Sequence, residues 1–132
     1  MSFMKTILVI EDNQEIRENT VELLELHNYV VMSAENGGIG FQMAKENLPD
    51  LILCDMMMPE TDGRQFLNLA KAHEKVQHIP IVFFSAGTPA ISVQNGLIEE
   101  SNGFIKKPFS ENELLETIKR EIKKPDDYHL EW

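Results

Sequence analysis

The stretch LILCDMMMPETDG, residues 51–63, decides how the chain folds. Its first four residues are apolar, and a continuous apolar run is typical of a strand buried on both faces of a parallel sheet. The run ends in Asp55, and Pro59 and Gly63 follow as turn and helix-start residues. A carboxylate at the end of a hydrophobic run is an unusual place for a charge. Asp55 is therefore the first candidate for a functional residue.

Short apolar runs alternate with longer amphipathic segments along the rest of the chain. We expect strands at 6–10, 29–33, 51–55, 81–85 and 103–106, and helices at 13–27, 37–47, 62–74, 90–99 and 110–123. Ser110 and Glu113 have the spacing of a capping box at the start of the last helix. Because alternating strands and helices favour parallel pairing with helices on both faces, we predict an α/β fold with a doubly wound parallel sheet.

Length and charge exclude several classes of protein. The chain has 132 residues, 42% of them hydrophobic, which suits one globular domain with a real core. Its formal charge is −10, from 22 acidic and 12 basic residues. Such a chain repels phosphate backbones and anionic lipid, so we expect no direct binding to nucleic acid and no membrane association.

The single cysteine and the N-terminus bear on the cellular compartment. Cys54 cannot form an internal disulfide, and we interpret it as a small buried hydrophobe, with a reactive thiol as the alternative. The apolar runs are too short to span a bilayer, and acidic residues follow the first run at once, unlike a signal peptide. We expect a soluble cytoplasmic protein.

Polar residues follow the predicted strands where each one ends. They are Glu11 and Asp12, Asp55, Ser85, and Lys106 and Lys107. The carboxyl ends of parallel strands meet at one edge of the sheet, where ligands bind in such folds. Carboxylates gathered there would repel one another unless a divalent cation lay between them. All-oxygen ligands suit Mg²⁺, with Mn²⁺ as a substitute, and the four histidines show no zinc-binding spacing.

This set of groups predicts phosphoryl-transfer chemistry. A metal and a lysine neutralise the phosphoryl oxygens, and a hydroxyl donates a hydrogen bond to one of them. A carboxylate can serve as the nucleophile and form an acyl phosphate. Asp55 is the best candidate for that role, because it lies between the acidic pair and the side of Ser85 and Lys107.

Four motifs together resemble the receiver domain of two-component response regulators. They are IEDN after the first strand, DMMMPETDG after the third, SA after the fourth and KKPF after the fifth. Each is weak alone, but the four in this order are a strong signal. The resemblance covers about residues 5–123 and implies a flavodoxin-like fold with strand order 2-1-3-4-5. It assigns residues 1–124 to the domain and 125–132 to a tail or the start of a linker.

The resemblance also implies a role for each site residue. Asp55 would accept a phosphoryl group, and Lys107 would pair with that group. Glu11, Asp12 and Asp55 would hold Mg²⁺, together with the backbone carbonyl of Met57. Ser85 would be the switch hydroxyl and Phe104 the switch aromatic, which turns inward when Ser85 moves toward the phosphate. A permanently buried core ring remains the alternative for Phe104, and a solvated edge residue is our interpretation of Lys106.

The implied function is a signalling switch with only limited self-phosphorylation and autodephosphorylation activity. The phosphoryl donor would be a sensor histidine kinase or a histidine phosphotransfer protein. The surface that changes would comprise the helix at 90–99, the strand at 103–106 and the last helix. The same surface could also form a homodimer. The output would be a separate protein target or a fused output domain. Met57 and Gly87, two residues past Asp55 and Ser85, lack polar side chains that could position a hydrolytic water, so we expect a long-lived phosphoryl group.

Three other classes of protein remain as alternatives. A haloacid-dehalogenase-type phosphatase needs a second aspartate two residues after the nucleophile, where this chain has Met57. A flavodoxin-like FMN carrier needs a hydroxyl-rich phosphate loop after the first strand, where this chain has the acidic EDNQE. A pseudo-receiver, which binds partners without being phosphorylated, is disfavoured by the complete set of site residues.

Overall fold

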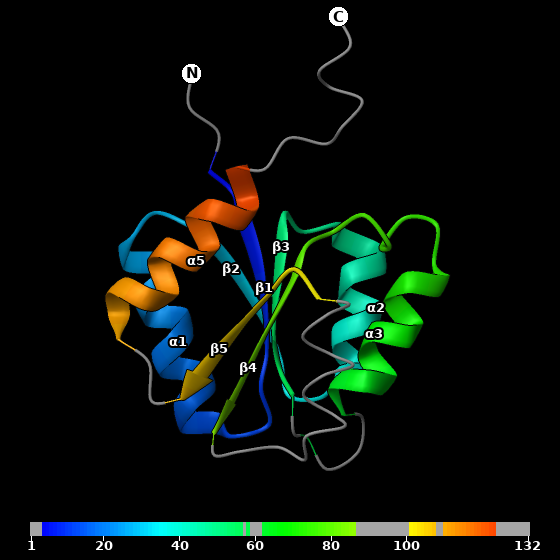
Figure 1. The fold of residues 1–132 in the computed structure, drawn as a ribbon, viewed down its shortest axis with the longest axis horizontal. Coiled ribbons are helices and arrows are strands. Elements are labelled where there is room, and N and C mark those ends of the chain that lie inside the picture. Colours follow the sequence, from blue (N-terminus) through cyan, green and yellow to red (C-terminus); the bar gives the residue numbers. More distant parts are fainter. Residues whose placement is uncertain (1–3, 57, 59–61, 87–100, 108–109, 124–132) are drawn as a thin grey trace, which may run out of the picture.

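The computed structural model describes residues 4–56, 58, 62–86, 101–107 and 110–123, and its elements form one three-layered α/β unit (Figure 1). The strands are β1 (Thr6–Ile10), β2 (Val30–Ala34), β3 (Leu51–Asp55), β4 (Ile81–Ala86) and β5 (Gly103–Lys107). The helices are α1 (Gln14–Leu26), α2 (Gly37–Asn47), α3 (Gly63–Ala72) and α5 (Glu111–Lys123). The helix expected at 90–99 lies outside the described residues.

All five strands are parallel and form one sheet in the order β2-β1-β3-β4-β5. This confirms the predicted fold class and strand order. In Figure 1, α1 and α5 cover one face of the sheet, and α2 and α3 cover the other. The carboxyl ends of the strands lie together at one edge, at the bottom of that view.

The core consists of two apolar layers separated by the sheet. Side chains alternate along each strand, so Leu8 and Ile10 face α2 and α3, whereas Ile7 and Val9 face α1 and α5. β1 and β3 are buried along nearly their whole length, as their continuous apolar runs predict. These two strands are neighbours, with Ile10 in register with Cys54.

The predicted ranges 6–10, 37–47 and 51–55 match the observed elements, and the other described elements differ by one or two residues at an end. Asn13 is the N-cap of α1, because its side chain accepts a hydrogen bond from the backbone N–H of Ile16. α3 ends at Ala72 because His73 has an extended backbone. β5 includes Lys107, which pairs with Ala86 of β4.

Helix caps fix where α3 and α5 begin. The backbone N–H of Glu113 donates to Ser110 Oγ at 3.0 Å, and the backbone N–H of Ser110 donates to Glu113 Oε1 at 3.2 Å, which confirms the predicted capping box. A second capping box, formed by Asp62 and Gln65, starts α3 and was not predicted. No helix in the described ranges is long and apolar enough to cross a bilayer.

Candidate functional site

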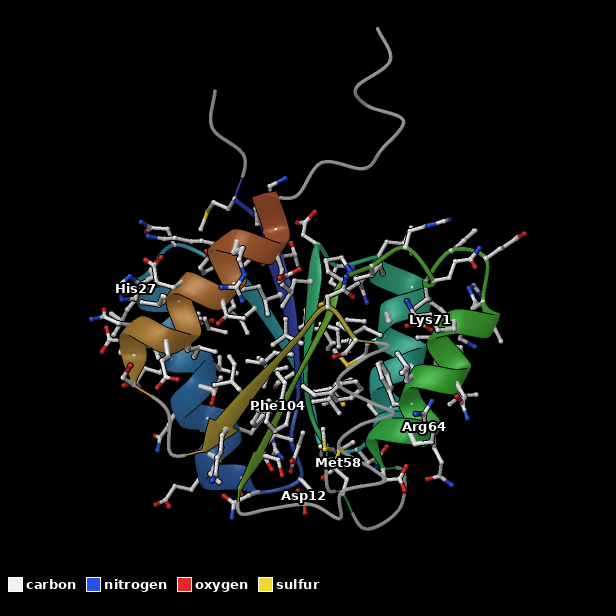
Figure 2. All side chains as sticks on the ribbon, viewed as in Figure 1. Asp12, His27, Met58, Arg64, Lys71 and Phe104 are labelled. Carbon is white, nitrogen blue, oxygen red and sulfur yellow. The ribbon has the colours of Figure 1, made fainter. Side chains whose placement is uncertain are left out.

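Three carboxylates meet at the carboxyl ends of β1 and β3. One ligand oxygen from each of Glu11, Asp12 and Asp55 lies within 4.8 Å of the others. Asp55 ends β3, and Glu11 and Asp12 directly follow β1, so the adjacency of these two strands brings the acids together. Figure 2 shows Asp12 at this end of the sheet, on the same side as Met58. The predicted clustering of the acids is therefore present.

Two of the three carboxylates are buried, which makes their negative charge energetically costly. Glu11 is 1% exposed and Asp55 is 5% exposed, whereas Asp12 is exposed. Carboxylates are rarely buried to this degree unless a partner or a cation offsets the loss of hydration. Two buried acids and one exposed acid form a donor set made only of oxygen, open to solvent on one side. This set fits Mg²⁺, which binds oxygen ligands and keeps several waters.

A short network of hydrogen bonds holds the loop that carries two of the acids. The backbone N–H of Glu11 donates to the carbonyl of Ala34 at 3.0 Å, which ties the loop to the end of β2. The backbone N–H of Asn13 donates to Glu11 Oε2 at 3.0 Å. Arg17 Nη1 donates to the carbonyl oxygen of Glu11 at 2.8 Å. Asn13 and Arg17 were not predicted as site residues, because their contacts with Glu11 involve backbone groups, which carry no sequence signal.

Ser85 and Phe104 lie on the same face of the sheet. Phe83 is in register with Phe104, and Ser85 follows two residues later on β4, so alternation places the side chains of Ser85 and Phe104 on one face. Ser85 is fully buried, and Phe104 is half-buried against the apolar layer on the α2–α3 side. Figure 2 shows Phe104 at β5, in the centre of the view.

The two lysines and Met57 are described to different extents. Lys106 is exposed, which agrees with a solvated edge lysine. Lys107 ends β5 in register with Ala86, at the same edge of the sheet as the acids. The side chain of Lys107 and the whole of Met57 lie outside the described part of the structure.

Cys54 lies directly before Asp55, and both burial and neighbouring charges affect the pKa of its thiol. Burial raises the pKa of Cys54 well above its ordinary value, and the carboxylates of Asp55 and Glu11 raise it further. The Sγ atom lies 3.4 Å from the carbonyl oxygen of Asp55, to which it donates. This confirms the interpretation of Cys54 as a small buried hydrophobe.

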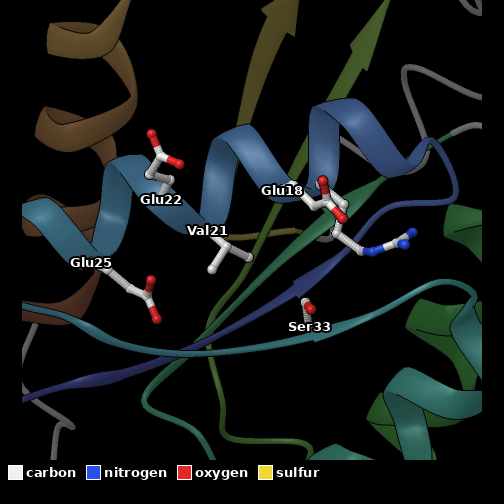
Figure 3. Close-up of a pocket in the computed structure, with 6 residues that line it drawn as sticks. Glu18, Val21, Glu22, Glu25 and Ser33 are labelled. Atoms are coloured by element: carbon white, nitrogen blue, oxygen red, sulfur yellow. The ribbon is translucent and has the colours of Figure 1, made fainter.

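A groove lies between α1 and the edge strand β2 (Figure 3). Its volume is about 370 Å³. It is lined by Arg17, Glu18, Val21, Glu22, Glu25 and Ser33. Half of its lining residues are glutamates, and Arg17 connects it to the loop that carries Glu11 and Asp12.

Comparisons with known proteins identify the family and support the fold. A family model described as the response regulator receiver domain matches residues 7–119. The chain is 37% identical over 114 residues to histidine kinase P4 of Formosa agariphila, covering 86% of this chain and 8% of that protein. It is 33% identical to the phosphate regulon transcriptional regulatory protein PhoB of Pseudomonas aeruginosa, covering 91% of this chain and 52% of that protein. The chain thus spans about half the length of PhoB and a small part of the kinase.

Solved structures show the same fold. A response regulator receiver domain protein from Clostridium thermocellum superposes with a TM-score of 0.82 at 25% identity, covering 90% of this chain and 94% of that one. The chemotaxis protein CheY4 of Vibrio cholerae superposes with a TM-score of 0.81 at 26% identity, covering 89% and 98%. Because the family match extends over most of the sequence, the chain belongs to the response regulator receiver domain family.

Proposed function

We propose that this chain is a phosphorylation-dependent signalling switch in which Asp55 accepts a phosphoryl group. The family places the chain in two-component signalling, as a signalling module rather than a classical enzyme. The observation that carries the assignment to Asp55 is its position, because its carboxylate ends a buried strand within 4.8 Å of Glu11 and Asp12. The donor would be the phosphohistidine of a sensor histidine kinase or of a histidine phosphotransfer protein.

The transfer is a substitution at phosphorus. A carboxylate oxygen of Asp55 attacks, and a new O–P bond forms as the N–P bond of the phosphohistidine breaks. The imidazole leaves with the electron pair and takes up a proton from solvent. A small donor such as acetyl phosphate would supply the group in the same way, with acetate as the leaving group. Such limited self-phosphorylation is part of this proposal.

The residues that would hold Mg²⁺ are Glu11, Asp12 and Asp55, with the backbone carbonyl of Met57. Receiver domains typically bind Mg²⁺ at an acidic site of this kind. The ion would offset the charge of the carboxylates and of the incoming phosphoryl oxygens. Mn²⁺ also prefers oxygen ligands and could replace it. Glu11, held by Arg17 and by the backbone N–H of Asn13, provides a fixed ligand position for the ion.

Lys107 and Ser85 would contact the phosphoryl group, and Phe104 would change position in response to it. The new group adds negative charge and strong acceptor oxygens at the end of β3. Ser85 would move to donate a hydrogen bond to it, and the ring of Phe104 would enter the vacated space. The shared face of Ser85 and Phe104 supports this coupling. The switch is a two-state element biased by a local change of charge.

The signalling surface would include β5, α5 and the predicted helix at 90–99. This surface would bind a downstream protein or an output domain fused to the receiver, and homodimerisation would use the same surface. The chain matches about half of the transcriptional regulatory protein PhoB, so the matching region is only part of that longer regulator. We place this action in the cytoplasm.

The test is the intact mass of the protein after incubation with acetyl phosphate and Mg²⁺. One added phosphoryl group is expected in the wild type. It should be absent from Asp55→Asn and from wild type treated with EDTA. A chain that stays unmodified while folded, even when a histidine kinase replaces acetyl phosphate, would contradict the proposal and favour a pseudo-receiver.

A further inference from the structure

Arg17, which is not one of the proposed metal ligands, forms a hydrogen bond with Glu11, which is one of them. Arg17 belongs to α1, and its Nη1 reaches back to the carbonyl oxygen of Glu11, six residues earlier, at 2.8 Å. The side chain is half-buried, so the guanidinium holds this contact partly shielded from water. Hydrogen bonds from a charged donor are shorter and stronger than neutral ones.

Arg17 makes this contact although carboxylates lie on its other side. Glu18, Glu22 and Glu25 line the same groove, and Figure 3 shows their side chains projecting from α1. Within the described ranges, no ion pair involves Arg17. The guanidinium thus donates to a neutral carbonyl beside the acidic cluster instead of pairing with a glutamate of the groove.

The carbonyl that Arg17 holds belongs to the residue that anchors the acidic loop. Glu11 is fixed to β2 through its backbone N–H and to Asn13 through one carboxylate oxygen. Arg17 adds the third attachment, at the peptide group that connects Glu11 to Asp12. Orientation of this peptide sets where Asp12 points. Three carboxylates this close repel one another, and the hydrogen bond from Arg17 helps to hold the loop against that repulsion.

We propose that Arg17 is a positioning residue for the metal site, which raises the affinity for Mg²⁺ by holding the peptide between Glu11 and Asp12. This inference rests on the proposed metal role of Glu11, Asp12 and Asp55. Arg17 does not touch the ion or the phosphoryl group. It acts through the loop, as the outer partners of metal ligands do.

Two physical effects of Arg17 on cation binding have opposite signs. Its positive charge repels an incoming cation, so a neutral side chain would strengthen metal binding if charge decided the outcome. Its hydrogen bond holds the ligands in place, so the same change would weaken binding if position decided it. Mutation of a residue that holds a metal ligand in place typically changes metal affinity by about 10–100-fold, and water screens the charge of a half-buried guanidinium. We therefore expect position to prevail.

The experiment measures Mn²⁺ binding by the electron paramagnetic resonance signal of free Mn²⁺, for the full chain. The variants are Arg17→Gln, which removes the charge and shortens the side chain, and Arg17→Lys, which keeps the charge but has a single compact donor. Lys71→Gln is the control, because it removes one positive charge from an exposed position on α3 (Figure 2). Thermal unfolding of each variant establishes that it is folded.

Arg17→Gln should bind Mn²⁺ roughly tenfold more weakly than wild type, Arg17→Lys should weaken binding less, and Lys71→Gln should bind like wild type. Equal or tighter binding by folded Arg17→Gln and Arg17→Lys would overturn the inference and leave the proposed metal site intact. Absence of Mn²⁺ binding by the wild type would contradict the metal site itself, and the inference with it. The two failures are therefore distinguishable.

Discussion

At Cys54, burial and neighbouring charge act on the thiol in the same direction. The side chain has no exposed surface, and burial raises its pKa well above the ordinary 9.0, with further contributions from Asp55 and Glu11. The thiolate is the reactive form of cysteine. Because a raised pKa keeps the thiol protonated at a pH where an ordinary thiol is half ionised, we expect Cys54 to be unreactive in the folded chain.

This predicts strong protection of Cys54 from thiol reagents. At pH 9.0, where an ordinary thiol would react readily, the native protein should show almost no modification by an aromatic disulfide reagent. Unfolding in guanidinium should expose one thiol that reacts at the rate of a small-molecule thiol. Similar rates in the native and unfolded protein would show that the thiol is accessible.

The lifetime of the phosphoryl group is a second property set by single residues. Met57, two residues after Asp55, and Gly87, two residues after Ser85, offer no side chain that can position a water for hydrolysis. Both lie outside the described residues. We expect phosphorylated wild type to persist well beyond seconds, and Met57→Asn to release phosphate faster.

Phosphate release after removal of excess donor measures this lifetime. Met57→Leu is the matched control, because it changes the side chain without adding a polar group, and it should behave like wild type. A wild-type lifetime of seconds, or equal lifetimes for the three proteins, would contradict the prediction.

Among the elements, α2 shows why local propensity gives an incomplete account. Its glycines weaken a helix, yet residues 37–47 form one with Asn36 as N-cap. A Cβ atom at Gly40 would lie 2.8 Å from Cγ1 of Ile10 and closer still to its Cδ1. Gly40 therefore allows α2 to pack closely against β1, the strand that leads into Glu11 and Asp12.

Gly40→Ala should destabilise the protein by about 1–2 kcal/mol. The added methyl overpacks the core around Ile10, and this cost exceeds the gain of up to about 1 kcal/mol in helix propensity. Gly38→Ala is the control, because the nearest atom to its Cβ would be Asn36 Oδ1 at 3.4 Å, an ordinary contact. Urea unfolding should show opposite signs for the two variants. Stabilisation by both would mean that the core accommodates the methyl.

The sequence predicted elements better than it predicted contacts between them. Continuous apolar runs identified the buried strands within a residue, and the Ser110–Glu113 spacing identified the start of α5. The close approach at Gly40 and the 3.0 Å pair between His27 and Glu111, 84 residues apart, depend on how helices pack. The contact of Arg17 ends on a backbone carbonyl, which carries no sequence signal.

Across the whole molecule, a formal charge of −10 and a cluster of three acids predict that Mg²⁺ stabilises the fold. A cation that binds only the folded chain adds about 2.7 kcal/mol at roughly 100 times its Kd. Without metal, Asp12→Asn should be at least as stable as wild type, because one repulsive charge is gone. The added stability should depend on Mg²⁺ in wild type and be largely lost in Asp12→Asn.

Thermal unfolding with MgCl₂, compared with NaCl of the same ionic strength, checks this prediction. The salt control separates specific binding from general screening of the negative charge. An equal effect of the two salts on wild type, or an equal Mg²⁺ effect on both proteins, would show that the acidic cluster does not bind the ion specifically.

Topology explains why the acidic site could be predicted at the level of the whole molecule. Parallel strands place their carboxyl ends at one edge, so acids distant in sequence, Glu11, Asp12 and Asp55, were expected to meet, and they do. The burial of Glu11 and Asp55 was less predictable, because it depends on the side chains and loops packed around them. The roles of Ser85, Lys107 and Phe104 were inferred from the family resemblance and stay predictions.

The most direct test of the account identifies the phosphorylated residue. The protein is treated with acetyl phosphate and Mg²⁺ and then with borohydride, which reduces an aspartyl phosphate to homoserine, and its peptides are sequenced by mass spectrometry. We predict homoserine at position 55 and at no other aspartate. Homoserine at Asp12 instead, or none at all in protein that carries an added phosphoryl group, would contradict the assignment of Asp55 as the phosphoacceptor.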